Sequence, residues 1–121
     1  MKTNYWLYLI GIILLGLGIL ILRPVPIPAE KDCLVTKGIV NGIFEGGTHD
    51  VVFKLKDQTK QFYINRGTEN GLDINKLQNE IMNKEIVIKY PNYWTPLDPG
   101  NTILHASKIE FNGKTIYTEL D

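Results

Sequence analysis

Leu34-Val-Thr-Lys-Gly-Ile-Val-Asn-Gly-Ile-Phe-Glu45 is the stretch of sequence that decides the fold. Its β-branched and aromatic residues predict one long strand. The two glycines inside it, Gly38 and Gly42, are typical of a bulge or a tight bend, which a small barrel uses to turn a corner. We therefore expect a long, strongly bent first strand at the start of a small β domain.

A hairpin is predicted on the C-terminal side of this stretch. Residues 45–50 are rich in turn formers and lead into an alternating segment at 51–56, while residues 57–60 turn the chain into a second segment at 61–65. In both segments apolar residues recur at every second position, with Tyr63 on the opposite face. The apolar residues of the expected inner face are Val51, Phe53, Leu55, Phe62 and Ile64.

One short helix and three further strands follow. Asp73 is placed to cap a helix whose apolar residues fall at i, i+3 and i+7, namely Ile74, Leu77 and Ile81. Residues 91–101 contain three prolines and predict a long loop. Asn112-Gly113 is a strong signal for a tight hairpin turn. The remaining strands are expected at residues 85–90, 102–111 and 114–118.

This order of elements, β-β-β-α-β-β with a terminal strand, resembles that of the OB-fold, a five-stranded and partly open barrel. The resemblance covers residues 34–111 and rests on element order. It implies a mainly β domain over residues 34–121, built as a small OB-fold-like β-barrel with one short helix and a C-terminal hairpin. An SH3-like barrel or an irregular β-sandwich is the structural alternative.

Three short motifs add a second resemblance: Phe44-Glu-Gly-Gly47, Tyr63-Ile-Asn-Arg-Gly67 and Trp94-Thr-Pro-Leu-Asp-Pro99. Through them the chain is similar to small single-span bacterial membrane-anchored proteins of uncharacterised function with an OB-like barrel. That resemblance implies an overall shape and no activity.

An apolar run lies on the N-terminal side of the domain. After a tail at residues 1–4, Tyr5–Leu22 contains 18 consecutive residues without a charge. As a helix it spans roughly 27 Å, close to the ~30 Å hydrocarbon core, so we expect a transmembrane helix with the lipid bilayer as its partner. Aromatic residues at one end and Arg23 at the other suit the two interfaces. A cleaved signal peptide is the alternative, although no small-x-small site follows the run.

Residues 23–33 predict a stiff, proline-rich stalk between this helix and the domain. The charges that flank the helix are nearly balanced, with Lys2 on one side and Arg23, Lys31 and Lys37 on the other. A short tail before a single span commonly stays in the cytoplasm, so we expect a single-pass protein whose C-terminal domain is extracytoplasmic. The lone Cys33 is compatible with either compartment.

Charge and residue inventory narrow the function classes. The 11 basic and 13 acidic residues after Pro28 give a net charge of −2, which argues against a dedicated nucleic-acid binder. The chain has one serine, one cysteine and two histidines. A Ser107–His105 dyad and a weak cation site are disfavoured alternatives, the latter from Glu45, His49 and Asp50. We therefore predict no enzyme, no catalytic residue, no metal site and no cofactor.

The candidate ligand-binding residues are Tyr63, Arg66, Tyr90, Tyr93 and Trp94. OB-folds bind ligands on the face of strands 2 and 3 and through neighbouring loops, where aromatic rings can stack on a ligand. The competing interpretation is that the loop at residues 91–101 plugs one end of the barrel, with Trp94 and Leu97 in the core.

The function predicted from the sequence is a non-enzymatic, membrane-tethered binding module for a protein or envelope component. The alternative is a cytoplasmic-facing tethered OB module that binds single-stranded nucleic acid or another macromolecule. In that case Lys54, Lys56 and Lys89 would accompany the aromatic residues.

Overall fold

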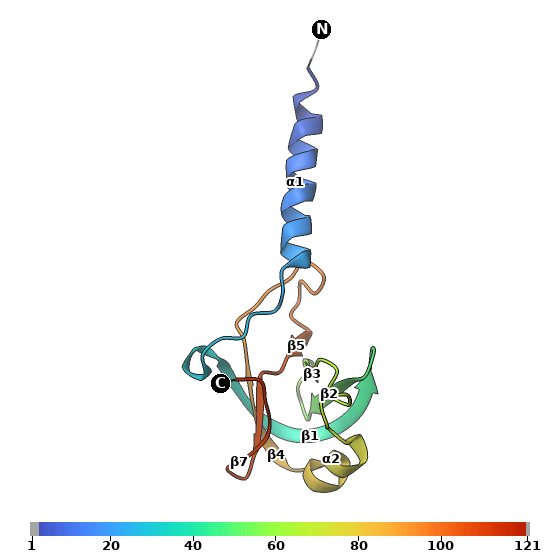
Figure 1. Ribbon diagram of the computed structural model, residues 1–121, viewed down its shortest axis with the longest axis vertical. Helices are drawn as coiled ribbons and strands as arrows, with labels where there is room; N and C mark the ends of the chain where they lie inside the picture. The colour runs from blue at the N-terminus through green and yellow to red at the C-terminus, as the bar shows by residue number, and fades with distance from the viewer. Residues whose placement is uncertain (1–2, 121) are drawn as a thin grey trace.

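The computed structural model describes residues 3–120, which form one long helix standing on a small β domain (Figure 1). The helix, α1, spans Tyr5–Leu22 as predicted. Its length and composition are sufficient to cross a membrane, and it could serve as a membrane anchor or a signal sequence. Lys2, which enters the prediction of orientation, lies outside the described residues.

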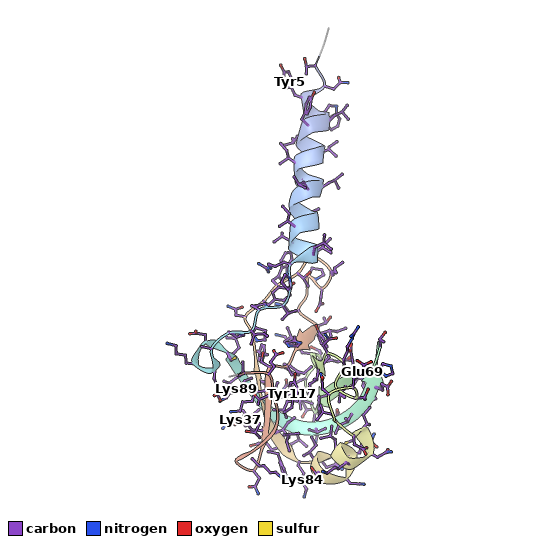
Figure 2. The ribbon with its side chains drawn as sticks, viewed as in Figure 1. Tyr5, Lys37, Glu69, Lys84, Lys89 and Tyr117 are labelled. Atoms are coloured by element: carbon purple, nitrogen blue, oxygen red, sulfur yellow. The ribbon has the colours of Figure 1, made fainter. Side chains whose placement is uncertain are left out.

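The side chains of α1 point outward on all sides of the helix axis (Figure 2). None of its residues is buried against the domain. A helix this apolar that packs against nothing in the described part of the chain has its side chains available to lipid.

The domain contains a short 3₁₀ helix, a seven-stranded mixed sheet and one further helix. The 3₁₀ helix, η1, covers Glu30–Asp32, and α2 covers Ile74–Ile81. The strands are β1 (Leu34–Gly46), β2 (Asp50–Leu55), β3 (Gln61–Ile64), β4 (Glu85–Tyr90), β5 (Ile103–His105), β6 (Lys108–Phe111) and β7 (Lys114–Thr118). Their order across the sheet is β5-β3-β2-β1-β4-β6-β7.

The long first strand is the centre of this sheet and is visibly curved (Figure 1). Its first half pairs with β4 and its second half with β2, and the register shifts between Val40 and Gly42. The predicted bend is therefore confirmed. Gly38 is needed for close approach, because a Cβ there would lie 2.9 Å from Leu55 Cδ1.

The prediction of a barrel is wrong, because the sheet is not closed. Among the described residues its two end strands, β5 and β7, do not pair with each other. The single strand expected at residues 102–111 is broken into β5, which is parallel to β3, and β6, which is antiparallel to β4. At the break Ala106 N donates to Tyr63 O and Ser107 N to Lys89 O, both at 2.8 Å. These two residues thus bridge the two halves of the sheet without forming a closing ladder.

The predicted faces and caps agree with the structure. Val51, Phe53 and Leu55 are buried, as are Phe62 and Ile64. The helix α2 begins after Asp73, whose Oδ1 accepts from Lys76 N at 3.2 Å, and it buries Leu77 and Ile81 against the sheet. Asn112 and Gly113 both have positive φ, which the tight turn between β6 and β7 requires.

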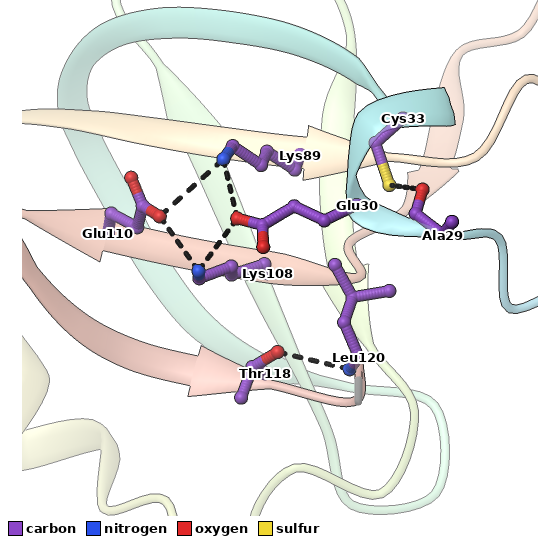
Figure 3. Close-up of polar contacts among 8 residues, drawn as sticks. All are labelled: Ala29, Glu30, Cys33, Lys89, Lys108, Glu110, Thr118 and Leu120. Atoms are coloured by element: carbon purple, nitrogen blue, oxygen red, sulfur yellow. Dashed lines mark hydrogen bonds and ion pairs between the residues drawn. The ribbon is translucent and has the colours of Figure 1, made fainter.

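A cluster of four charges ties the end of the stalk to the sheet (Figure 3). Glu30 of η1 accepts from Lys89 Nζ at 2.7 Å and from Lys108 Nζ at 2.8 Å, and Glu110 lies 3.0 Å from Lys108 Nζ. Hydrogen bonds from Lys108 and then Lys89 lower the pKa of Glu30 to about 2. Since β4 and β6 hold both lysines, the stalk is fastened to the rigid part of the domain.

Candidate functional site

A row of side chains crosses the sheet on the face opposite the core. The register places Phe44 of β1 beside Val52 of β2, Val52 beside Tyr63 of β3, and Tyr63 beside His105 of β5. Side chains alternate along a strand, so residues adjacent to this row face the core. The row therefore crosses four strands on this face, with Phe44 exposed, Tyr63 half-buried, and Val52 and His105 largely covered.

Phe44, Val52 and Tyr63 of this row form the floor of an open groove of about 570 Å³. One side is bounded by the β1–β2 turn and the other by the loop at residues 95–98. Ile103 at the end of β5 is 54% exposed and Phe44 is 39% exposed, so the floor offers apolar surface to a ligand. The groove is lined by Phe44, Gly46, Gly47, Asp50, Val52, Gln61, Tyr63, Asn65, Thr95, Asp98 and Ile103.

Tyr63 lies at the centre of this groove. Its half-buried ring meets the His105 ring edge to face, with the centroids 5.4 Å apart and the planes at 74°. Burial raises the pKa of the Tyr63 hydroxyl above its ordinary value of 10.0, so the group stays protonated and can donate a hydrogen bond. His105 Nε2 lies 2.7 Å from Glu119 Oε1, which holds the imidazole in place beneath the tyrosine.

The two carboxylates of the groove are already engaged by their own chain. Asp98 accepts from Thr102 N, Thr102 Oγ1 and Ile103 N at 3.0, 2.7 and 2.8 Å. The bond from Ile103 N is the largest of the effects that lower the Asp98 pKa. Asp50 Oδ1 accepts from Arg66 N at 2.9 Å. Both acids therefore shape loops, and the polar side chains left to meet a ligand are Gln61, Tyr63, Asn65 and the hydroxyl of Thr95, which accepts from Leu97 N and can still donate.

A smaller cavity of about 60 Å³ continues from the groove toward the stalk. It shares Tyr63 and Thr95 with the groove and adds Tyr93 and Val25. The groove and this cavity therefore adjoin the segment that joins the domain to α1.

The structure brings only part of the predicted site together. Tyr63 and Tyr93 line the adjoining cavities. Tyr90 instead packs edge to face on Phe62, with ring centroids 5.4 Å apart, and belongs to the core periphery. Arg66 does not line the groove, and its Nε lies 3.8 Å from Glu69 Oε2. Trp94 is 43% exposed, so the prediction that it plugs the core is wrong.

Sequence reasoning missed Phe44, Val52 and Ile103 as members of the site. In the sequence Val52 alternates with Val51 and Phe53 of the predicted inner face, which was the available signal that it points to the opposite face, although Val52 itself is buried. The alignment of Phe44 and Val52 with Tyr63 depends on strand register, which a single strand does not reveal. Among the predicted lysines, Lys54 lies 5.4 Å from the Phe44 ring, whereas Lys89 is held by Glu30 on the other half of the sheet.

The disfavoured chemical alternatives do not assemble. Ser107 is fully buried and its Oγ has no hydrogen-bond partner among the described residues, while His105 Nε2 is directed at Glu119. His49 lies near Glu45 and Glu69, at 3.6 and 3.8 Å, but Asp50 is engaged by Arg66. Within residues 3–120, no group of three His, Cys, Asp or Glu side chains could hold a metal ion.

No family assignment follows from the sequence of this chain. No protein-family model matches the chain, and no curated protein matches it.

Proposed function

We propose that this chain is a non-enzymatic, membrane-anchored binding module that takes an extended, largely apolar protein segment into the groove. The groove itself carries the proposal. Its volume of about 570 Å³ lies within the range of about 300–1,000 Å³ that is usual for ligand sites. Its apolar floor suits side chains, and the amide and hydroxyl groups of Gln61, Asn65 and Thr95 suit a peptide backbone.

The charge of the groove favours a protein segment over nucleic acid. Among the described residues that line it there are two aspartates, Asp50 and Asp98, and no lysine or arginine. A strand of phosphates needs cations along its track. The aromatic groups could stack on bases, but the lining carries acidic side chains, and Lys54 beside the Phe44 ring adds a single cation at its edge.

The proposal also assigns a role to α1: it is an uncleaved membrane anchor that holds the domain on the extracytoplasmic side. The partner is then a protein of the cell envelope. Cys33 is a poor probe of this orientation, because burial raises the pKa of its thiol and its Sγ lies 3.7 Å from Ala29 O. A Cys33→Ser, Ala29→Cys variant places an exposed thiol on the stalk.

We expect a membrane-impermeant maleimide to label this variant equally in intact and permeabilised cells. Labelling only after permeabilisation would place the domain in the cytoplasm and refute the extracytoplasmic assignment. Recovery of the protein at its full, uncleaved mass in the membrane fraction would distinguish an anchor from a cleaved signal sequence.

Binding is tested with the full-length protein in lipid nanodiscs and a displayed library of random peptides. We expect enrichment of peptides with apolar residues at alternate positions, and loss of their binding in Ile103→Asp, which places a charge on the groove floor. The matched control is Asn79→Asp, which adds the same charge on the exposed side of α2. Equal binding to both variants, or preferential binding of an oligothymidine strand measured by fluorescence anisotropy, would refute the proposal.

A further inference from the structure

The loop at residues 91–101 reaches back from the domain to the end of α1 (Figure 1). Arg23, the first residue after α1, donates from Nη2 to Trp94 O at 2.9 Å, and Tyr93 donates from its hydroxyl to Arg23 O at 3.1 Å. The Arg23 guanidinium also lies 4.7 Å from the centroid of the Tyr93 ring. These contacts place Tyr93 and Trp94 at the same level as the residue that ends the apolar helix.

The loop holds large apolar side chains in solvent at this level. Trp94 is 43% exposed and Leu97 is 71% exposed. Their positions are set by bonds within the loop: Trp94 Nε1 donates to Pro99 O at 3.1 Å, and Leu97 N to Thr95 Oγ1 at 3.3 Å. The loop is therefore preorganised around two exposed apolar groups that the domain core does not use.

We infer that this loop docks on the bilayer surface, with Trp94 and Leu97 inserted among the lipid headgroups and upper acyl chains around the end of α1. The inference rests on the proposed anchoring of α1. Tryptophan is enriched at membrane interfaces because its ring is both apolar and polar, and Arg23 can extend its charge to the headgroups. The loop contacts Arg23, the residue that directly follows α1, so a bilayer crossed by α1 would lie beside the exposed Trp94 and Leu97.

Docking also fixes what kind of segment reaches the groove. Thr95 and Asp98 belong to this loop and line the groove as well. The groove therefore opens beside the headgroup layer, and the segment it takes is a juxtamembrane stretch of another membrane protein.

The two tryptophans of the chain, Trp6 and Trp94, allow anchoring and docking to be measured separately. Full-length Trp6→Phe reports Trp94 alone, and full-length Trp94→Phe reports Trp6 alone. Each is placed in phosphatidylethanolamine–phosphatidylglycerol nanodiscs, with and without lipids brominated on the upper acyl chain, and is titrated in parallel with aqueous acrylamide.

Docking predicts that brominated lipid quenches Trp94 to an extent comparable with Trp6, and that acrylamide in nanodiscs quenches Trp94 no more strongly than Trp6. In the Trp6→Phe background, Leu97→Asp should reduce lipid quenching of Trp94, whereas Asn79→Asp on α2, far from α1 in Figure 1, should leave it unchanged. Lipid quenching of Trp6 without quenching of Trp94 would overturn docking and leave the anchor in place. Absence of lipid quenching at both positions would overturn the anchor as well.

Discussion

Ser107→Ala should stabilise the protein, although it removes a polar group from the interior. Ser107 is fully buried between β5 and β6, and its Oγ has no hydrogen-bond partner within residues 3–120. A buried hydroxyl without a partner costs ~1–3 kcal/mol relative to its hydrated state. The backbone bonds of this residue, from its N to Lys89 O and to its O from Glu119 N, do not depend on the side chain.

The gain is reduced by the packing contacts that the oxygen atom makes, each worth ~0.1–0.2 kcal/mol. We therefore expect a net increase of ~1 kcal/mol in the free energy of unfolding, or a rise in Tm of about 4–8 °C for a domain of this size. The measurement is urea and thermal unfolding of the full-length protein in detergent micelles, followed by circular dichroism.

A partnered hydroxyl provides the control. Thr102 Oγ1 donates to Asp98 Oδ1 at 2.7 Å, so Thr102→Val should move stability in the opposite direction, by ~0.5–1.5 kcal/mol. A clear loss of stability in Ser107→Ala would refute the reasoning, because it would mean that the hydroxyl makes a favourable interaction, for example with a bound water.

Three further predictions concern the stalk junction, a close backbone approach and the exposed loop. The lowered pKa of Glu30, about 2 against an ordinary 4.5, means that its stabilising contribution is present above pH 4.5 and is lost as the pH falls toward 2. The difference in unfolding midpoint between wild type and Glu30→Gln should accordingly be constant above pH 4.5 and shrink as the pH falls from 4.5 toward 2. A difference that persists at the acid end would contradict the ion-pair account. Gly67→Ala should destabilise the domain by ~1–3 kcal/mol in urea unfolding, because its Cβ would lie 2.6 Å from the buried Val51 Cγ2, whereas Gly100→Ala has room and should behave as wild type. Trp94→Ala in detergent should change the free energy of unfolding by less than ~1 kcal/mol, since the ring is exposed, and a loss near the ~3–5 kcal/mol of a core aromatic would restore the plug interpretation.

Local features of the domain were accessible from the sequence. The alternation of Val51, Phe53 and Leu55, the Asp73 cap and the Asn112-Gly113 turn all depend on residues within a few positions of one another. Such patterns report which face of a strand or helix meets the core, and the structure agrees with them.

Whether the sheet closes, and which residues line the groove, could not be predicted from local sequence patterns. The break at Ala106-Ser107 occurs in a stretch that alternates like one strand, and only pairing with β3 and β4 shows that its halves belong to different parts of the sheet. Aromatic residues that look equivalent in the sequence are separated by the fold, with Tyr90 packed on Phe62 and Tyr63 facing the groove.

The sequence by itself determined an apolar helix over Tyr5–Leu22, the positions of α2 and of the strands other than β5 and β6, and the core-facing residues of the hairpin, because these follow from short-range periodicity. Only the tertiary structure decided that Phe44, Val52 and Tyr63 form one row, and that Trp94 lies beside Arg23, 71 residues away in the chain. Both arrangements depend on strand register and on contacts between distant segments. The free energy of these contacts is distributed over the whole sheet, so no single stretch of sequence predicts them.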